Sequence, residues 1–507
     1  MLTTLIRREL LDNLMTFRFA VAVLIMLLLV VANTAVLLKD YEQRLTLYND
    51  AVKTHQQQLQ EKKTYSAGIT YAGEMRIDRP PNPLSIFNTG FDKRIGNKVT
   101  VSHTYVPSLW DSGWHGSNPF MDMFASMDIA FIFEVILSLL ALVFAYDTLA
   151  GEYEHGTLRL ILTHSVRRGH ILLAKYISAM LCLLVPLLMS LLLAVILLTT
   201  TPSIFLNTDD FLRIGGIILA SVVYLSVFYL IGLLISAATR RTSTALMLAM
   251  FVWGFLVLVY PNVILAVIPR PEAPQTRAAS AFGQIQQIWQ VEFSGELGHF
   301  LTTNASPEID WDLGLTGSGA EPYAYSWKDP QTLYYSFENI FAFEGFDEKE
   351  EHKIPHAQSY FRFLGRLVTR TADQTWLIRK PALEDIFIHP ANVKRIWLKL
   401  SPVGLYDAAT QAWAGTDLHG ARDFFDAARR YRQEVIDALY DKEAFGSRQW
   451  FSSDKGAADW SILPQFSFQR ADVNTNAKRA LPDVSILLMI NIVIFILIFL
   501  IFVKSEV

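Results

Sequence analysis

The chain has 507 residues, of which 52% are hydrophobic and 18% are charged, and its mean hydropathy is +0.28. These values exceed what one soluble core requires and exclude an ordinary soluble domain. The net charge of −4 favours no partner class, and we expect no nucleic acid partner. Cys182 is the single cysteine, so a disulfide within the chain and a cysteine metal site are excluded. We therefore expect an integral membrane protein.

Six apolar runs are long enough to cross a membrane, because a hydrocarbon core of about 30 Å needs roughly 20 helical residues. We predict spans at residues 19–38, 128–147, 171–199, 214–239, 242–268 and 484–503. An even number of spans places both termini on one side. A cleaved signal peptide is a poorer interpretation of residues 19–38, because the run is too long and no small-residue cleavage site follows it.

Basic residues predict which side is cytoplasmic, because Lys and Arg near span ends are retained there. Arg7, Arg8 and Arg18 flank the first span, and Arg240 with Arg241 separates the fourth from the fifth. Residues 1–18 should form a cytoplasmic interfacial helix, and residues 200–213 a short external loop that carries Asp209 and Asp210. We expect a multi-pass protein of the cell (inner) membrane with both termini in the cytoplasm.

Two long segments, residues 39–127 and 269–483, would then be exported. Both contain Trp, Tyr, Pro and Gly without low-complexity tracts, so they should fold, and Trp413 is among the tryptophans expected outside. The predicted fold is mainly α: a six-helix transmembrane bundle with an α+β extracytoplasmic domain built from two insertions.

Residues 148–170 form a short cytoplasmic loop with an unusual charge order. The acids Glu152 and Glu154 precede a run of helix formers, and Arg167 with Arg168 follows, which suits the dipole of a short interfacial helix. The loop resembles that of type-2 ABC transporter permeases, in which the second and third spans are joined by an Asp, a Glu, a Gly-Thr-Leu step, an Arg and a Lys. The corresponding residues here are Asp147, Glu152, Gly156, Thr157, Leu158, Arg168 and Lys175, while Ser165 stands where the family usually has a proline.

The resemblance also covers the six spans and the basic amphipathic segment at residues 2–14. Residues 79–96 and 400–435 resemble a subgroup of these permeases with a large extracytoplasmic domain.

Membership of this family would imply a separate ATP-binding-cassette ATPase that docks on the cytoplasmic loop. A phosphate-binding loop ending in Gly-Lys-Ser/Thr is absent from the sequence, so ATP and Mg²⁺ are expected on the partner and no cofactor on this chain. The candidate coupling residues are Asp147, Glu152, Glu154, Gly156, Thr157, Arg159 and Arg168. Alternatively, these charges only solvate the loop and fix the topology.

Two other polar features have competing interpretations. Glu134 in the second span could contact a substrate, or it could reach the outer interface or pair with Arg213. His352 and His356 have metal-like spacing, but Pro355 would break the helix that presents both rings, so we expect no metal site.

Heptad spacing predicts a stalk beyond the first span. No glycine or proline occurs between residues 39 and 65, so the first span should continue outward as one helix. One seam would comprise Tyr41, Leu45, Tyr48, Val52 and Leu59, and an antiparallel second seam Phe424, Ala428, Tyr431 and Val435. The alternative is a pair of helices that cover an ordinary core.

Two functions follow from these expectations. The first is a non-enzymatic permease subunit that exports a lipophilic or amphipathic substrate, as a homodimer or as a heterodimer with a related permease. The second is mechanotransmission, in which ATP-driven motion of the spans is relayed to a periplasmic or surface partner without transport. An enzyme on a membrane anchor is a third possibility, but no catalytic constellation occurs at suitable spacing.

Overall fold

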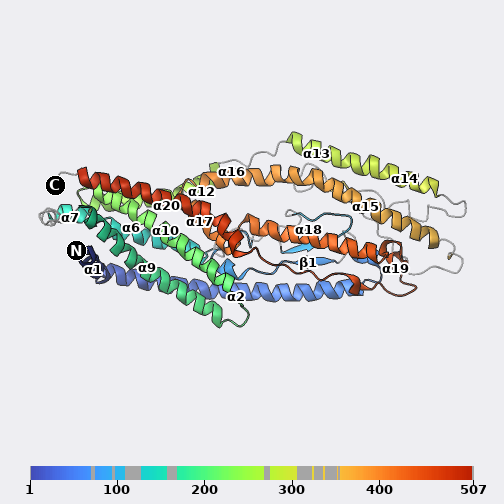
Figure 1. Ribbon diagram of the computed structural model, residues 1–507, viewed down its shortest axis with the longest axis horizontal. Helices are drawn as coiled ribbons and strands as arrows, with labels where there is room; N and C mark the ends of the chain where they lie inside the picture. The colour runs from blue at the N-terminus through green and yellow to red at the C-terminus, as the bar shows by residue number, and fades with distance from the viewer. Residues whose placement is uncertain are drawn as a thin grey trace.

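The protein is elongated, with both termini at one end (Figure 1). The computed structural model describes residues 2–69, 75–93, 97–108, 127–156, 168–267, 275–304, 323–324, 335–336, 351 and 354–504. At the end that holds the termini, long helices form a bundle. At the other end lies a second body, which we name the distal domain and define by α13–α15, α18, α19 and the β1–β2 ribbon.

In the described part of the chain, six helical segments are long and apolar enough to cross a membrane: Phe19–Glu61, Ile129–Glu154, Arg168–Thr200, Thr208–Ala238, Thr242–Val267 and Val473–Phe502. They confirm the predicted number of spans. The helices concerned are α2 (Phe17–Glu61), α5 (Ile129–Ile132) with η2 (Phe133–Leu137), α6 (Ser138–Ala145) and α7 (Ala150–Glu154), α9 (Arg168–Thr200), α10 (Thr208–Ala238), α11 (Thr242–Trp253) with η3 (Gly254–Val259) and α12 (Tyr260–Val267), and α20 (Val473–Lys504).

Helix α10 is the centre of the bundle. In its most apolar stretch of 18 residues, 72% of the residues are buried, a larger share than in any other candidate span among the described residues. Tyr224, Phe228 and Tyr229 are completely buried along it. Gly232 allows α6 to approach, since a Cβ at this position would lie 2.6 Å from the Cβ of Ala145. The amphipathic helix α1 (Leu2–Leu14) packs on α9 at the end that holds the termini.

Helix α2 joins the bundle to the distal domain without interruption, as the sequence predicts. Its 45 residues contain no glycine or proline, and Thr16 caps the first turn by accepting a hydrogen bond from the amide of Phe19. At 1.5 Å per residue the helix is about 68 Å long, roughly twice the thickness of a hydrocarbon core. Its second half therefore extends well beyond the bundle (Figure 1).

The described part of the distal domain is mainly helical. It contains α3 (Tyr65–Ile69), α13 (Gln275–Gln287), η4 (Ile288–Phe293), α14 (Ser294–Thr303), α15 (Ile354–Leu383), α18 (Leu418–Asp441), η8 (Ala444–Gly446), α19 (Arg448–Phe451) and η9 (Trp460–Ile462). Strands occur only as two short antiparallel pairs in the described residues: β1 (Arg76–Asp78) with β2 (Lys98–Thr100), and β3 (Tyr323–Ala324) with β4 (Tyr335–Ser336). An α+β domain is therefore not confirmed.

One helix of the second predicted insertion returns into the bundle. After α15, η7 (Glu384–Ile388) and α16 (His389–Leu398), helix α17 (Pro402–Ala414) packs against α10 and α20. The Tyr406 ring stacks on Tyr224 with centroids 4.4 Å apart, and its hydroxyl lies 3.0 Å from that of Ser221. Because Ser221 lies about 20 Å along α10 from its start, residues 402–414 belong to the bundle core. Trp413 is buried there at 8% exposure, and its expected extracytoplasmic side stays a prediction.

The two predicted seams do not pair along their length. Helix α2 packs instead against β1, η1 (Pro83–Ile86) and α5, and the β1–β2 ribbon lies between α2 and α18 (Figure 1). Phe424 packs edge-to-face on Phe466 and Phe468, and Tyr431 on Phe466. Leu59 reaches the edge of the same core, which also contains Ala428 and Val435. Tyr41 and Leu45 pack on the bundle core. The heptad spacing thus reflects helices that cover a core.

Candidate functional site

A buried ion-pair cluster joins three helices at the bundle end that holds the termini. The ammonium group of Lys175 on α9 lies 3.2 Å from a carboxylate oxygen of Glu9 on α1 and 2.7 Å from one of Glu152 on α7. The Lys175 side chain is 5% exposed, and that of Glu152 is 17% exposed. One cation shared by two carboxylates fixes α1 and α7 on the bundle.

The short helix α7 is held at both ends by the neighbouring spans. The hydroxyl of Ser236 accepts hydrogen bonds from the amides of Leu149 and Ala150, which are the free donors at the start of this helix. At its other end, the carboxylate of Glu154 accepts hydrogen bonds from the amide and the hydroxyl of Thr242, where α11 begins. Rotation of α7 must therefore displace α10 and α11.

The structure changes the interpretation of several predicted coupling residues. Glu152 was expected to face water, but it pairs with Lys175 and its side chain is only 17% exposed. Glu154 is exposed but caps α11. The Asp147 carbonyl accepts a hydrogen bond from the amide of Gly151 in α7. Arg168 donates a hydrogen bond to the carbonyl of Phe502 at the end of α20. Gly156 ends the turn with a φ of +70°, and Thr157 and Arg159 lie outside the described residues.

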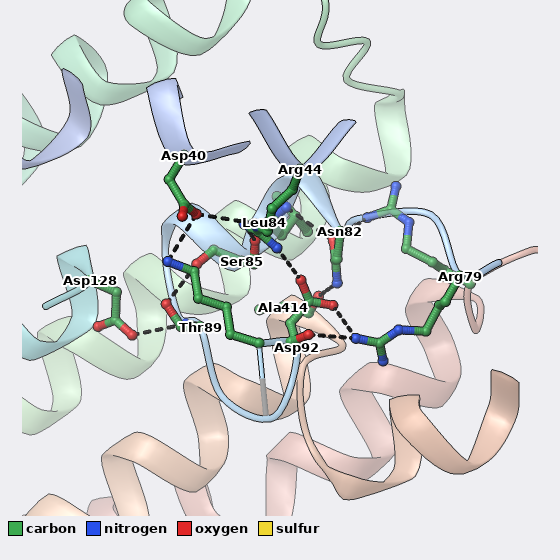
Figure 2. Close-up of polar contacts among 12 residues, drawn as sticks. Asp40, Arg44, Arg79, Asn82, Leu84, Ser85, Thr89, Asp92, Asp128 and Ala414 are labelled. Carbon is green, nitrogen blue, oxygen red and sulfur yellow. Dashed lines mark hydrogen bonds and ion pairs between the residues drawn. The ribbon is translucent and has the colours of Figure 1, made fainter. Parts of the chain in front are cut away.

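A second polar cluster lies where α2 leaves the bundle, and we name it the joint; Figure 2 shows part of it. We define it by Asp40, Arg44, Arg79, Asn82, Ser85, Asp92, Lys93, Asp210, Arg213 and Arg470. Its local structure follows from the sequence at residues 79–93. Asn82 caps η1 by accepting a hydrogen bond from the amide of Leu84, and Pro83 starts that helix.

Close contact with the start of α18 shapes the same segment. Gly90 has a φ of +47°, and a Cβ there would lie 2.5 Å from the Thr416 carbonyl oxygen, so only glycine fits. The Thr416 carbonyl also accepts a hydrogen bond from the amide of Phe91.

Within the joint, α2 is tied to this segment by shared ion pairs. Arg44 donates hydrogen bonds to the carboxylates of Asp92 at 2.9 Å and Asp40 at 3.0 Å. The ammonium group of Lys93 also pairs with Asp40, at 2.9 Å. Arg79 donates to the other carboxylate oxygen of Asp92 at 2.8 Å (Figure 2). The Asp92 carboxylate is thus shared by the guanidinium groups of Arg44 on α2 and Arg79, which precedes η1. Such a network resists relative movement better than isolated surface pairs.

The joint continues into the core helix α10. Asp210 has a completely buried side chain and pairs with Arg213 and with Arg470, each at 2.9 Å. Arg470 also donates to Asn82, whose amide group donates to the Ala414 carbonyl at the end of α17. The joint therefore connects α2, α10, α17 and the chain that leads from the distal domain into α20.

A cavity of about 490 Å³ opens beside these residues. Its lining is polar and includes Arg79, Asn82, Asp92, Asp209, Asp210, Arg213, Asp423, Arg470, Asn476 and Arg479. The sequence patterns did not reveal this site, because its members come from distant segments: Asn82 and Arg470, which are hydrogen-bonded, are 388 residues apart. The resemblance of residues 79–96 and 400–435 to a permease subgroup covered two of its segments, while Asp209, Asp210 and Arg213 entered the sequence predictions for other reasons.

Glu134 does not pair with Arg213. It lies in the η2 turn of the second span, where its carbonyl accepts a hydrogen bond from the hydroxyl of Tyr224. Arg213 donates instead to Asp210 and to the carbonyl of Ala471. Contact between Glu134 and a substrate stays a prediction. Among the described residues, no three His, Cys, Asp or Glu side chains are grouped to hold a metal ion.

The distal domain buries two titratable groups next to each other. Burial lowers the pKa of His103 to about 4, although the Ile69 carbonyl near its Nδ1 acts in the opposite direction. Its ring packs edge-to-face on Phe445 and Trp450. Burial also lowers the pKa of Arg432, which donates to the carbonyls of Ser102 and His103 and pairs with Asp373. These groups fix the loop after β2 on α18.

Six candidate spans, an amphipathic helix on the bundle and a separate distal domain define the class: a multi-pass membrane protein. The sequence matches the family described as ABC-2 family transporter protein over residues 3–296, more than half of the chain, so the protein belongs to that family. Residues 390–469, which include α17 and α18, match a domain of unknown function, DUF3526.

Two curated relatives are similar to part of the chain. Both are named probable ABC transporter permease protein NosY. The protein from Stutzerimonas stutzeri is 34% identical over 136 residues, and the one from Pseudomonas aeruginosa is 33% identical over 137 residues. Each match covers 26% of this chain and 48% of the relative. The chain thus spans about half the length of the curated relatives it matches.

Proposed function

We propose that this permease subunit transmits motion driven by a separate ATPase from the bundle to the distal domain, which acts on an extracytoplasmic partner. The bundle end that holds the termini faces the cytoplasm, since Arg7, Arg8, Arg240 and Arg241 lie at that end. The ATPase docks there, on the loop at residues 148–170. Movement of α7 reaches α1 and α9 through Lys175 and reaches α11 through Glu154.

The observation that carries this proposal is the continuity of α2 through the joint. A single helix of 45 residues extends from the bundle to the distal domain. It is anchored at the joint by Arg44 and, farther out, by His55, whose Nδ1 lies 2.6 Å from a carboxylate oxygen of Asp78 in β1. Tilting α2 must therefore move the distal domain.

Export of a lipophilic or amphipathic substrate is the competing function. The continuous helix α2 favours the relay over export, because it extends from the bundle to the distal domain. Reconstituted vesicles that contain the permease and its ATPase distinguish the two functions. ATP-dependent movement of a fluorescent lipid across the bilayer would support export and contradict a pure relay.

An insertion tests the relay itself. Gly-Gly-Ser placed after Lys39 interrupts α2 between the bundle and the joint. We expect ATP hydrolysis by the complex to continue, whereas the ATP-dependent change in hydrogen exchange of α18 and α19 should disappear. The same insertion after Gly456, in an exposed turn, is the control and should leave that change intact. An unaltered exchange response with the insertion after Lys39 would exclude α2 as the lever.

A further inference from the structure

Helix α16 carries an apolar stripe that stays exposed among the described residues. The stripe comprises Val393, Ile396, Trp397 and Leu400, with exposed fractions of 46%, 66%, 49% and 66%. Positions i, i+3, i+4 and i+7 lie on one face of a helix, the spacing with which an amphipathic helix presents its apolar side. Soluble surfaces rarely leave such a face in water, so it indicates a surface that meets another molecule or a membrane.

Hydrogen bonds to the fifth candidate span hold α16 in place. The hydroxyl of Tyr260 donates to the carbonyl of Trp397 at 2.7 Å, and the hydroxyl of Ser401 donates to the carbonyl of Leu256 at 3.0 Å. The chain from residue 397 to residue 401 thus runs antiparallel to the chain from 256 to 260. Helix α16 therefore descends beside α12 toward the bundle (Figure 1).

The fifth candidate span gives the depth of the stripe. Arg241 precedes this span, and Tyr260 lies 19 residues farther along it. At about 1.5 Å per residue this distance is roughly 28 Å, close to the thickness of a hydrocarbon core. Trp397, the partner of Tyr260, therefore lies at the boundary between hydrocarbon and headgroups on the distal-domain side. Tryptophan and tyrosine are enriched at this level of a membrane.

Helix α20 gives the same depth independently. Residues 484–503 contain no charged side chain and are long enough to cross the hydrocarbon core, and Asp483 directly precedes them. The ammonium group of Lys399 lies 2.7 Å from a carboxylate oxygen of Asp483. Lys399 and Trp397 are two residues apart, so the two spans place the middle of the stripe at the same boundary.

The surface next to α16 is also apolar. In the most apolar stretch of the span at residues 242–267, only 11% of the residues are buried, the smallest share among the candidate spans in the described part of the chain. Val259 and Val263 are exposed within one helical turn of Leu256 and Tyr260, where α16 is bonded. The stripe thus adjoins side chains of a membrane span.

The charge of α16 favours a lipid surface over a second copy of the chain. Residues 389–400 include three basic residues, of which Lys399 pairs with Asp483, and no acidic residue. Two copies joined through this face would bring like charges together, whereas headgroup phosphates attract them. Lys394 adjoins the stripe, and its long side chain can extend toward a phosphate while the stripe contacts hydrocarbon.

We propose that α16 enters the leaflet on the distal-domain side and that its stripe contacts lipid, with Trp397 at the level of the headgroups and Leu400 among the acyl chains. Helices α15, η7 and α16 follow one another without a gap, so this contact fixes the base of a helix that extends into the distal domain. The leaflet then supports the distal domain at a point separate from α2 (Figure 1). The contact does not depend on the relay function.

Spin labels on the full chain in vesicles of dioleoylphosphatidylcholine test the contact. Val393→Cys, Ile396→Cys and Leu400→Cys are labelled on a Cys182→Ser background. Collisions are measured with oxygen, which concentrates in hydrocarbon, and with nickel(II) ethylenediaminediacetate, which stays in water. We expect the ratio of oxygen to nickel collisions to increase from residue 393 to 396 to 400. Leu377→Cys is the matched control, an apolar position on α15 that is 75% exposed and roughly 28 Å farther from the bundle, and its label should collide mainly with nickel.

Three outcomes would overturn the proposal. Nickel collisions as frequent at residue 396 as at residue 377 would place the stripe in water. Infrequent collisions with both reagents at residue 396 would show that protein covers the stripe, either a second copy or another segment of this chain. Equal ratios at the three labelled positions of the stripe would contradict the descent of α16 into the leaflet.

Discussion

Lys175 shows how a single buried side chain holds three helices of the bundle. Its ammonium group is shared between Glu9 on α1 and Glu152 on α7. Glu152 and Lys175 stood out in the sequence through the family resemblance, although Glu152 was expected in water. Glu9 did not stand out, because a residue 166 positions away becomes a partner of Lys175 only after α1 packs on α9.

Replacement of Lys175 by Met should destabilise the protein by about 3–5 kcal/mol, because two partly buried carboxylates lose their shared cation. The triple variant Lys175→Met, Glu9→Gln, Glu152→Gln removes the charges together and should recover most of the loss. Chemical denaturation of the purified chain measures both effects. A triple variant no more stable than the single one would contradict the assigned ion pairs.

His103 gives the distal domain a pH dependence whose sign follows from its burial. Its pKa is about 4 in the folded protein and 6.5 as the ordinary value, so the fold favours the neutral ring. The free energy of unfolding does not depend on this histidine's titration above pH 6.5. It falls as the pH drops from 6.5 toward 4, because the unfolded chain binds a proton that the folded chain does not. The loss should reach about 3 kcal/mol.

His103→Phe should flatten this decline between pH 6.5 and 4, measured by tryptophan fluorescence during denaturation. Phenylalanine can keep the packing on Phe445 and Trp450. His299→Phe replaces an exposed histidine of the same domain and should leave the decline unchanged. A wild-type distal domain whose stability is constant over this pH range would refute the assignment.

At the scale of elements, the length of the apolar runs predicted the six spans. The positions of α17 and α18 depend instead on packing partners that are far apart in sequence. Residues 402–414 are too short to span a membrane and are flanked by polar segments, so the sequence placed them outside. Their burial depends on Tyr224 of α10 and on α20, which no local pattern reveals. The heptad spacing on α18 correctly identified its buried face, but periodicity does not show which core a helix covers.

Two adjacent glycines test the packing of α17 on α10. A Cβ at Gly216 would lie 2.2 Å from the Trp413 ring, whereas Gly215 has open space. Gly216→Ala should therefore cost about 1–3 kcal/mol by overpacking. Gly215→Ala should be neutral or stabilise the helix by up to about 1 kcal/mol. Thermal unfolding of the two variants compares these effects, and equal stability would contradict the close contact.

At the scale of the whole molecule, two polar clusters lie at opposite ends of one bundle. The Lys175 cluster joins α9 to α1 and α7, which lie at the end that holds the termini (Figure 1), whereas the joint includes Asp210 at the opposite end of α10. Between them, α2 and α10 are continuous helices, and α2 extends past the joint to the distal core. This arrangement suits the transfer of a tilt from one end of the protein to the other.

The distance between the bundle and the far end of α2 tests this relay most directly. Spin labels at Arg240→Cys and Gln57→Cys, both exposed positions, are introduced on a Cys182→Ser background, and the protein is measured in nanodiscs with its ATPase. We predict that trapping with ATP and vanadate shifts the distance distribution, and that Gly-Gly-Ser after Lys39 removes the shift. An unchanged distribution in the protein without the insertion, or a shift that survives it, would contradict the relay.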